Sequence, residues 1–201
     1  MNQEKREYTD TENVYIFLFD GFSDWEIAYI TPELKKSKKT VLKFFTIDGL
    51  EIISAGGLKI TPDLSIEQLN PDNVSVLILP GGVAWEKKSI KEIDKLVETL
   101  NSETKTIAAI CGATTYLGQN GYLDKVKHTS NALDYLKYIA PNYKGEKYYQ
   151  SDFSVTDKNI ITANGTAPIE FAREIFRIIN LHSKNEIEKW FQLFKSGIWN
   201  E

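Results

Sequence analysis

The sequence predicts an α/β protein whose doubly wound, mainly parallel sheet lies between two layers of helices, a three-layer α/β/α sandwich. Short apolar runs alternate with segments of helical spacing, and such runs are typical of strands that are covered on both faces. The clearest runs are VYIFLF at 14–19, VSVLIL at 74–79 and TIAAI at 106–110. Alternation of strand and helix favours parallel strands joined by right-handed crossovers.

The other elements follow in order from local signals. Ser23 or Asp24 is suited to cap a helix that runs to Ile30, and Pro32 either kinks that helix or restarts it. Two short apolar segments flank a Gly-Gly pair and indicate a hairpin. Strands are expected at 41–47, 51–53, 58–60, 147–150, 153–156 and 160–163, and helices at 89–100, 113–119, 131–138, 168–181 and 186–194.

Length and composition favour one domain without a charged macromolecular partner. The chain has 201 residues, of which 42% are hydrophobic, and 28 acidic against 24 basic residues give a net charge of -4. This balance does not favour nucleic acid, and no apolar stretch is long enough to cross a membrane. We expect a flexible tail at 1–13, the domain at 14–183, a helical extension at 184–201, and a cytoplasmic location.

Cys111 is the central candidate for chemistry. It follows the strand at 106–110 directly and precedes a helix, and Ala109 and Ala113 stand two positions to either side. A nucleophile on a sharp strand-to-helix turn needs small flanking residues, because other chain segments pass close beneath it. The helix N-terminus also favours a thiolate, so we expect a lowered thiol pKa. The alternative is a small buried hydrophobe.

Two further segments end at the same edge of the predicted sheet. Gly81 and Gly82 close the strand at 74–79, and glycines let backbone N–H groups approach a ligand and stabilise an oxyanion. Glu26 lies early in the helix after the first strand. If it is buried against the cysteine, its pKa rises and it can donate a hydrogen bond to sulfur. An ordinary turn and a surface glutamate are the alternatives.

Four motifs together carry a resemblance to the DJ-1/PfpI family, within the class I glutamine-amidotransferase-like superfamily. The similarity extends from about Val14 to Leu181. The motifs are Asp20-Gly-Phe-x-Asp-Trp-Glu26, Leu79-Pro-Gly-Gly82, Ala108-Ala-Ile-Cys111-Gly-Ala-Thr and Ile161-Thr-Ala-Asn-Gly-Thr-Ala-Pro168.

The resemblance implies a flavodoxin-like fold, usually dimeric, with Cys111 as the reactive residue and a protonated Glu26 beside it. It also implies backbone donors at Gly82 and Gly112, and it brings Gly81 and Thr114 into the candidate site. Members of this family include peptidases, glyoxalase- or deglycase-type enzymes, isonitrile hydratases, chaperones and redox-responsive proteins. The fold alone does not choose among these activities.

The sequence departs from many relatives at the position of a site histidine, which we align with Asn131. His128 lies three residues earlier, and in a strand an odd offset turns it to the opposite face. His128 is therefore a base only if the strand is irregular, and Asn131 is instead suited to hydrogen-bond a substrate. A protease-type Cys-His pair is not supported.

Other chemistries lack their motifs. Two separated histidines and a single cysteine form no zinc motif, and no phosphate-binding glycine pattern is present, so we expect neither metal nor cofactor. The extension carries an apolar stripe that must be covered, either by the chain's own core, by a dimer partner or as a lid over the cysteine. The stripe comprises Ile187, Trp190, Phe191, Phe194, Ile198 and Trp199.

Two hypotheses from different classes follow. The first is an enzyme in which the Cys111 thiolate attacks a small carbonyl or amide compound, with hydrolase, amidase, glyoxalase or deglycase activity. The second is a non-enzymatic redox- or stress-responsive protein or chaperone with an oxidisable cysteine. An intracellular peptidase is a weaker third reading. A homodimer and a small-molecule substrate are the expected partners.

Overall fold

A seven-stranded sheet organises the fold, in the order β5-β2-β1-β6-β7-β9-β8, and only β8 runs antiparallel to its neighbour. This computed structural model describes residues 11–87 and 90–199. The three apolar runs form strands, as predicted, and these strands are neighbours at the centre of the sheet. The sheet comprises β1 (Glu12–Phe17), β2 (Thr40–Thr46), β5 (Leu64–Ser65), β6 (Val76–Leu79), β7 (Thr106–Ile110), β8 (Ser154–Asp157) and β9 (Ile160–Ala163).

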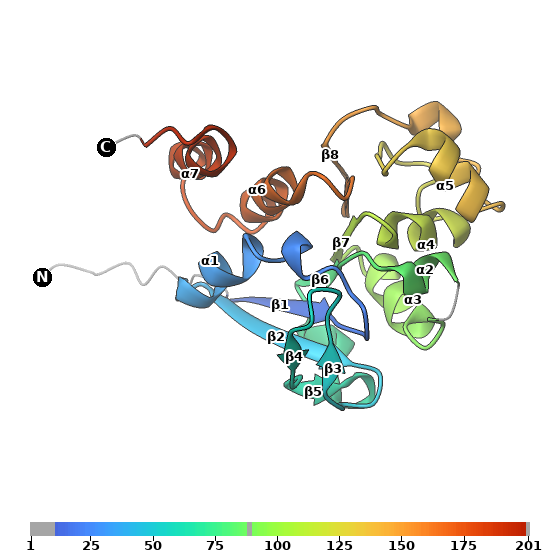
Figure 1. Ribbon diagram of the computed structural model, residues 1–201, viewed down its shortest axis with the longest axis horizontal. Helices are drawn as coiled ribbons and strands as arrows, with labels where there is room; N and C mark the ends of the chain where they lie inside the picture. Colours follow the sequence, from blue (N-terminus) through green and yellow to red (C-terminus); the bar gives the residue numbers. More distant parts are fainter. Residues whose placement is uncertain (1–10, 88–89, 200–201) are drawn as a thin grey trace, which may run out of the picture.

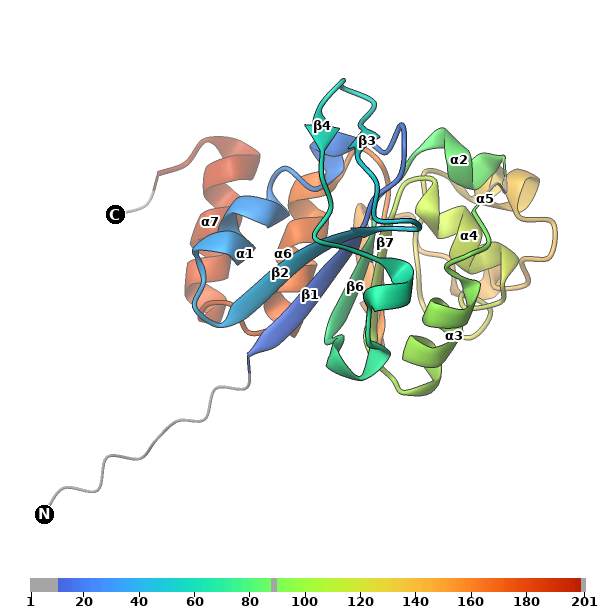
Figure 2. The same ribbon diagram turned by 90° about the horizontal axis from the view of Figure 1, so that it is seen from below.

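Helices cover both faces of this sheet, which confirms the three-layer α/β/α architecture (Figure 1, Figure 2). One layer holds α1 (Ile30–Lys36) and α6 (Pro168–Ile178), with α7 (Lys184–Ser196) beside α6. The other holds α2 (Val83–Glu86), α3 (Asp94–Ser102), α4 (Ala113–Gln119) and α5 (Leu133–Ile139). The central strands are sealed between them, and Phe17, Ile78 and Ala108 have no exposed surface.

The strand order places a topological switch point between β1 and β6. The chain leaves β1 toward β2 on one side and later returns to β6 on the other. In doubly wound sheets ligands bind outside the carboxyl ends of the strands at such a point. Residues that follow β1, β6, β7 and β9 therefore converge at one edge, and these segments carry Glu26, Gly81, Cys111 and Gly165.

The predicted hairpin is present and fixes the segment that carries Glu26. Strands β3 (Ile52–Ile53) and β4 (Lys59–Ile60) form a separate antiparallel pair. The Gly21 N–H donates to the Ile53 carbonyl at 2.7 Å, and the Ala55 N–H donates to the Phe22 carbonyl at 2.8 Å. The hairpin thus clamps the loop after β1 at the carboxyl edge of the sheet.

Several sequence-based expectations need correction. The helix expected from Ser23 or Asp24 is only a 3₁₀ turn, Asp24–Glu26, and α1 begins at Ile30. Pro32 then stands in the first turn of α1, where a residue without an N–H is tolerated. Residues 147–150 are not a strand, because Glu146–Tyr148 is a 3₁₀ turn and only Tyr149 makes a bridge, to His128.

The ends of several elements also differ. Strand β1 starts at Glu12, so Glu12 and Asn13 do not belong to a tail, while residues 1–10 lie outside the described residues. Helix α3 starts at Asp94 rather than at residue 89, which is itself not described. The two-residue strand β5 and the one-turn helix α2 were not predicted, because elements this short show no periodicity.

The apolar stripe of the extension packs on the protein's own helices. Helix α7 begins with a capping box of Ser183 and Glu186, and Ile187 and Phe191 are buried. Ring contacts join Trp190 to Phe176 of α6 and Phe194 to Tyr29, just before α1. Trp199, beyond the helix, is exposed.

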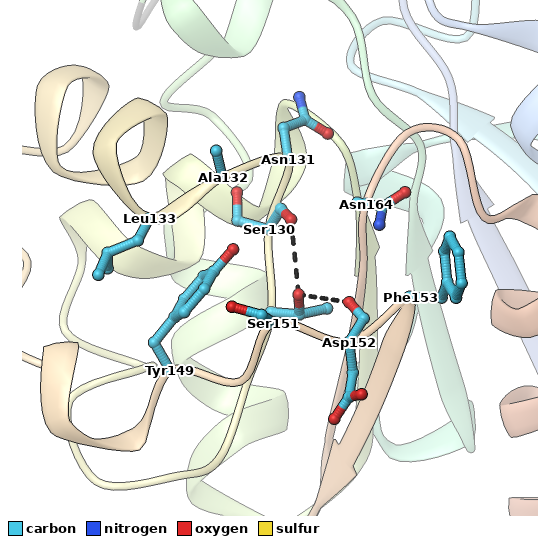
Figure 3. Close-up of a pocket in the computed structure, with 10 residues that line it drawn as sticks. Ser130, Asn131, Ala132, Leu133, Tyr149, Ser151, Asp152, Phe153 and Asn164 are labelled. Atoms are coloured by element: carbon cyan, nitrogen blue, oxygen red, sulfur yellow. Dashed lines mark hydrogen bonds between the residues drawn. The ribbon is translucent and has the colours of Figure 1, made fainter.

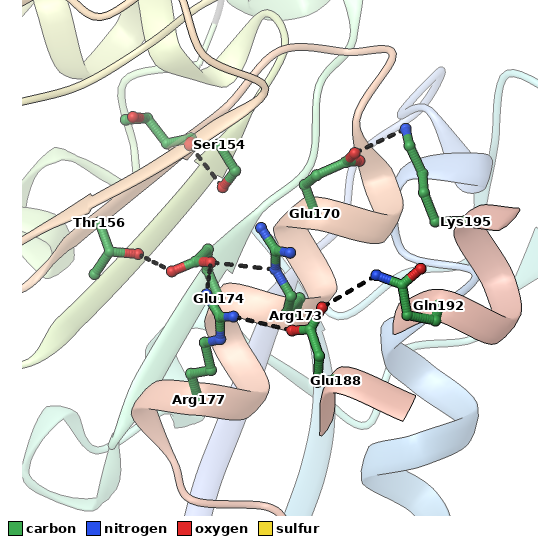
Figure 4. Close-up of polar contacts among 10 residues, drawn as sticks. Ser154, Thr156, Glu170, Arg173, Glu174, Arg177, Glu188, Gln192 and Lys195 are labelled. Atoms are coloured by element: carbon green, nitrogen blue, oxygen red, sulfur yellow. Dashed lines mark hydrogen bonds and ion pairs between the residues drawn. The ribbon is translucent and has the colours of Figure 1, made fainter. Parts of the chain in front are cut away.

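Polar contacts complete the junction of α6 and α7 (Figure 4). The Lys195 Nζ lies 2.7 Å from Oε1 of Glu170, whose side chain is only 6% exposed. Arg177 pairs with Glu174 on its own helix and with Glu188 on α7. Of these ion pairs, only the one between Lys195 and Glu170 includes a buried residue. Removal of Lys195 would therefore leave the Glu170 carboxylate in a desolvated position without its counter-ion.

We predict that Lys195→Ala lowers the free energy of unfolding by about 1–3 kcal/mol, the cost of leaving a buried polar group unsatisfied. The measurement is urea denaturation, with Lys184→Ala as the control because Lys184 is an exposed lysine on the same helix. Equal losses in the two variants would contradict a structural role for the Lys195–Glu170 contact.

Candidate active site

Cys111 occupies a strained turn between β7 and α4. Its φ is 57°, a left-handed value that a residue with a side chain adopts at a cost of about 1–3 kcal/mol. The Cys111 N–H donates to the Ala163 carbonyl at 3.0 Å, and the Thr114 hydroxyl donates to the Cys111 carbonyl at 2.6 Å. Bonds on both sides of the residue thus hold the turn, and its side chain is partly exposed.

Close packing around Cys111 explains the glycines of the site. A Cβ at Gly165 would lie 2.8 Å from the Cys111 sulfur, and a Cβ at Gly112 would lie 3.0 Å from the Gly82 carbonyl oxygen. A Cβ at Gly81 would meet the Cys111 Cβ at 2.7 Å. No side chain fits in these positions, so the backbone itself forms the walls around the sulfur.

Glu26 is buried beside the cysteine, as the resemblance to the family implied, and it is not the surface glutamate that the residues alone left open. It has no exposed surface, and its Oε2 accepts a hydrogen bond from the Gly81 N–H at 2.6 Å. Burial raises the pKa of Glu26 from 4.5 to about 7, against the opposing effects of the Gly81 N–H, Cys111 and Ser23. The carboxyl therefore exchanges its proton near neutral pH, where a general acid–base group is most effective.

The expectation of a lowered thiol pKa is wrong for the site with Glu26 ionised. Burial and the negative charge of Glu26 raise the pKa of Cys111 to about 11, although the Asn131 amide and the Gly112 N–H lower it. Helix α4 has only seven residues, and its N-terminus does not outweigh these effects. The carboxyl and the thiol titrate as a coupled pair that keeps one proton at neutral to moderately alkaline pH.

Asn131 contacts the sulfur directly. Its Nδ2 donates to the Cys111 Sγ at 3.4 Å, and its Oδ1 accepts from the Gly165 N–H at 2.8 Å. The side chain therefore lies beside the sulfur, at the position that we matched with the site histidine of many relatives. Its amide supplies hydrogen bonds but no base.

His128 and Thr114 are not placed to act on a substrate at the sulfur. His128 is fully buried, with Nδ1 at 2.7 Å from the Val126 carbonyl and Nε2 at 2.6 Å from the Tyr143 hydroxyl. Burial also lowers the pKa of His128. Both of its nitrogens are occupied away from Cys111, so it does not provide the base. Thr114 is buried and braces the turn, with its hydroxyl 2.7 Å from that of Ser130.

A second polar pair near the sulfur was missed from the sequence. The Tyr135 hydroxyl donates to Oε1 of Glu86 at 2.8 Å and so joins α5 to the end of α2. Burial, Glu86 and charge on Cys111 raise the pKa of Tyr135, and a hydrogen bond from Asn131 lowers it. Tyr135 lies in α5 and Glu86 at the end of α2, so no local pattern in the sequence marked the pair. Gly165, in the loop after β9, also lies against the sulfur, although the sequence marked it only as one residue of the motif at 161–168.

A cavity of about 360 Å³ lies next to this site (Figure 3). Asn131, which contacts the Cys111 sulfur, also lines this cavity. Another lining residue, Asn164, directly precedes Gly165, which lies against the sulfur. The lining contains hydroxyls, amides, aromatic rings and one carboxylate, but no lysine, arginine or histidine. The lining residues are Thr129, Ser130, Asn131, Ala132, Leu133, Tyr149, Ser151, Asp152, Phe153 and Asn164.

Metal and membrane features are not found in the described part of the chain. No group of three or more His, Cys, Asp or Glu side chains among residues 11–87 and 90–199 is arranged to hold a metal ion. None of the helices in those ranges is both long and apolar enough to cross a membrane.

A cysteine at positive φ after a central parallel strand, with a buried carboxyl from the loop of another strand, defines the class as α/β proteins with a nucleophile elbow. The DJ-1/PfpI family pattern matches residues 12–178, and the chain belongs to this family. The resemblance drawn from the four motifs is thereby confirmed.

Known relatives agree with this assignment. The chain is 39% identical over 193 residues to YoaZ of Bacillus subtilis, named an uncharacterized protease, with 92% of each chain covered. It is 33% identical to a deglycase of Pyrococcus abyssi over 118 residues, covering 58% of this chain and 70% of that one. A DJ-1 superfamily protein of Agrobacterium tumefaciens has a TM-score of 0.86 at 34% identity, covering 93% of this chain and 99% of its own.

The raised pKa of Glu26 predicts a pH-dependent stability. The folded state holds this proton more tightly than the unfolded chain, so the free energy of unfolding falls as pH rises from 4.5 to about 7. The shift corresponds to about 3 kcal/mol. We expect Glu26→Gln to be more stable than wild type at pH 8 by an amount of this order, and nearly equal to wild type at pH 4.5.

Chemical denaturation at the two pH values measures this difference. Glu98→Gln is the control, because Glu98 is an exposed carboxyl on α3 and its replacement should leave the pH dependence unchanged. The buried-proton account fails if Glu26→Gln follows the wild-type curve across the whole range.

Proposed function

We propose that this protein is an enzyme in which Cys111 attacks the electrophilic carbon of a small carbonyl or amide compound. The observation that carries the proposal is the cysteine at φ 57° with a buried carboxyl whose pKa is about 7. A strained, partly exposed nucleophile beside a neutral-pH base is a costly arrangement that structural needs do not explain. Relatives named protease and deglycase add support for an enzymatic role.

The carboxylate of Glu26 acts as the base in this mechanism. When the sulfur attacks, the thiol proton passes to Glu26, so the thiolate forms only as the bond to carbon develops. This role replaces the sequence-based expectation of a preformed thiolate. The amides of Gly82 and Gly112 are proposed to stabilise the oxyanion, and the Gly112 N–H already favours negative charge at Cys111.

The arrangement supports a small substrate better than a redox sensor. Oxidation of cysteine follows its thiolate character, and a thiol whose pKa is raised to about 11 has little of it in the resting site. The cavity beside Asn131 offers uncharged hydrogen-bonding groups of a size that suits a small molecule. We retain the homodimer as a proposal that a measurement of molecular mass in solution would test.

We predict that iodoacetamide modifies Cys111 in the wild type with a rate that rises through about pH 7, as Glu26 loses its proton. In Glu26→Gln this step near pH 7 should be absent, and the rate should instead rise through a single thiol pKa below that of the wild type, because the charge of Glu26 no longer raises it. The rate of modification is read by mass spectrometry.

Cys111→Ser serves as the control for the site of modification, because the chain contains one cysteine. A Glu26→Gln profile that coincides with the wild-type profile would remove Glu26 from the chemistry.

A further inference from the structure

Hydrolysis at Cys111 needs a second proton acceptor, and this inference rests on the proposed function. After the sulfur has been acylated, a water molecule must attack the acyl carbon and lose a proton. Glu26 has no exposed surface and lies against the sulfur with Oε2 bound to the Gly81 N–H, so it is poorly placed to meet a water that enters from solvent. His128 is occupied elsewhere.

The Tyr135–Glu86 pair has the position and the polarity for this step. The Tyr135 hydroxyl donates its hydrogen bond to Glu86 at 2.8 Å, so its oxygen can act as an acceptor, with one lone pair available beside the hydrogen bond from Asn131. The two elements that carry the pair, α2 and α5, lie on the same face of the sheet (Figure 2). Glu86 is exposed, so a proton that reaches it can leave to solvent.

Asn131 connects this pair to the nucleophile. One N–H of its amide donates to the Cys111 sulfur, and the same side chain is near enough to the Tyr135 phenol to lower its pKa. The Oδ1 of Asn131 is fixed by the Gly165 N–H, so the amide has a set orientation. A group bound to the sulfur therefore lies beside Asn131, within the neighbourhood of the phenolic oxygen.

We propose that Tyr135 and Glu86 together accept the proton of the hydrolytic water at Cys111, in place of the histidine that this site lacks. The water oxygen bonds to the acyl carbon as its proton passes to the Tyr135 oxygen, and the phenolic proton passes to Glu86. The carbon–sulfur bond then breaks, and the sulfur recovers a proton from Glu26. The product is a carboxylic acid that keeps the second hydrogen of the water, and the first leaves to solvent from Glu86.

Tyr135 is the residue that would touch the reacting water, and Glu86 acts through it as a positioning residue. Neither residue takes part in the first attack by sulfur. The proposal therefore predicts a separation of two rates, with acylation preserved and hydrolysis slowed when either residue is changed.

p-Nitrophenyl acetate separates the two rates, because its leaving group departs without needing a proton. In the wild type we expect a burst of nitrophenolate that depends on Cys111, followed by slower steady turnover. In Tyr135→Phe and Glu86→Gln the burst should persist, the steady rate should fall by about 100-fold, and the acetylated protein should accumulate in intact mass spectra.

Two controls distinguish a role in proton transfer from a structural one. Tyr138→Phe changes an exposed tyrosine of the same helix and should behave as wild type. Hydroxylamine, a nucleophile that needs no base, should restore turnover in Tyr135→Phe, and a variant that is no longer acetylated at Cys111 would not be rescued. The Glu86→Gln change affects an exposed side chain and keeps a hydrogen-bond acceptor, so it tests the pair without disturbing the fold.

The outcomes separate the inference from the function beneath it. Wild-type steady rates in both Tyr135→Phe and Glu86→Gln, with the burst intact, would overturn the role of the pair while leaving Cys111 as the nucleophile. A wild-type protein whose acetylation does not differ from that of Cys111→Ser would instead contradict the proposed function, and the inference with it.

Discussion

The contact between a buried carboxyl and a thiol is the constraint on which the rest of the site depends. Glu26 has no exposed surface, and its main hydrogen bond comes from the backbone N–H of Gly81. A carboxylate in such a position is poorly solvated, so its pKa rises to about 7. The negative charge of the ionised carboxyl in turn raises the pKa of Cys111. The titrations of the two groups are therefore coupled.

The fold supplies this contact through its topology. Glu26, Gly81 and Cys111 follow three adjacent central strands, and the switch point between β1 and β6 leaves room for them at one edge. The hairpin of β3 and β4 clamps the loop of Glu26, and bonds to Ala163 and Thr114 fix the turn at Cys111. Burial of the carboxyl and strain at the cysteine both cost free energy of folding, and burial of the apolar sheet beneath them offsets this cost.

The sequence predicted the central part of the fold well, because buried strands leave a strong apolar signal. β7 and α4 begin and end as predicted, and Cys111 lies between them at the expected turn. The position of Glu26 beside the sulfur followed from the family resemblance, and the hydrogen bond from Asn131 to the sulfur was not expected from the sequence. The short elements α2 and β5 were not predicted, because they have too few residues to show a hydrophobic period.

The electrostatics of the site could not be predicted in the same way. The pKa of Cys111 is shifted upward by burial and by the ionised Glu26 carboxyl. The local strand-to-helix turn, on which the expectation of a thiolate rested, contains no information about either. The Tyr135–Glu86 contact joins residues 49 positions apart on two short helices, so no local pattern pointed to it. Long-range proximity at polar positions is visible only once the helices are packed.

Infrared spectroscopy of the two acidic groups tests the central claim most directly, because the single cysteine gives one S–H band and Glu26→Gln identifies the carboxyl band by difference. The account predicts that the protonated carboxyl band of Glu26 persists to about pH 7 and then disappears, while the S–H band of Cys111 survives well above that pH. Loss of the S–H band below pH 7, or a Glu26 carboxyl already ionised at pH 4.5, would contradict it.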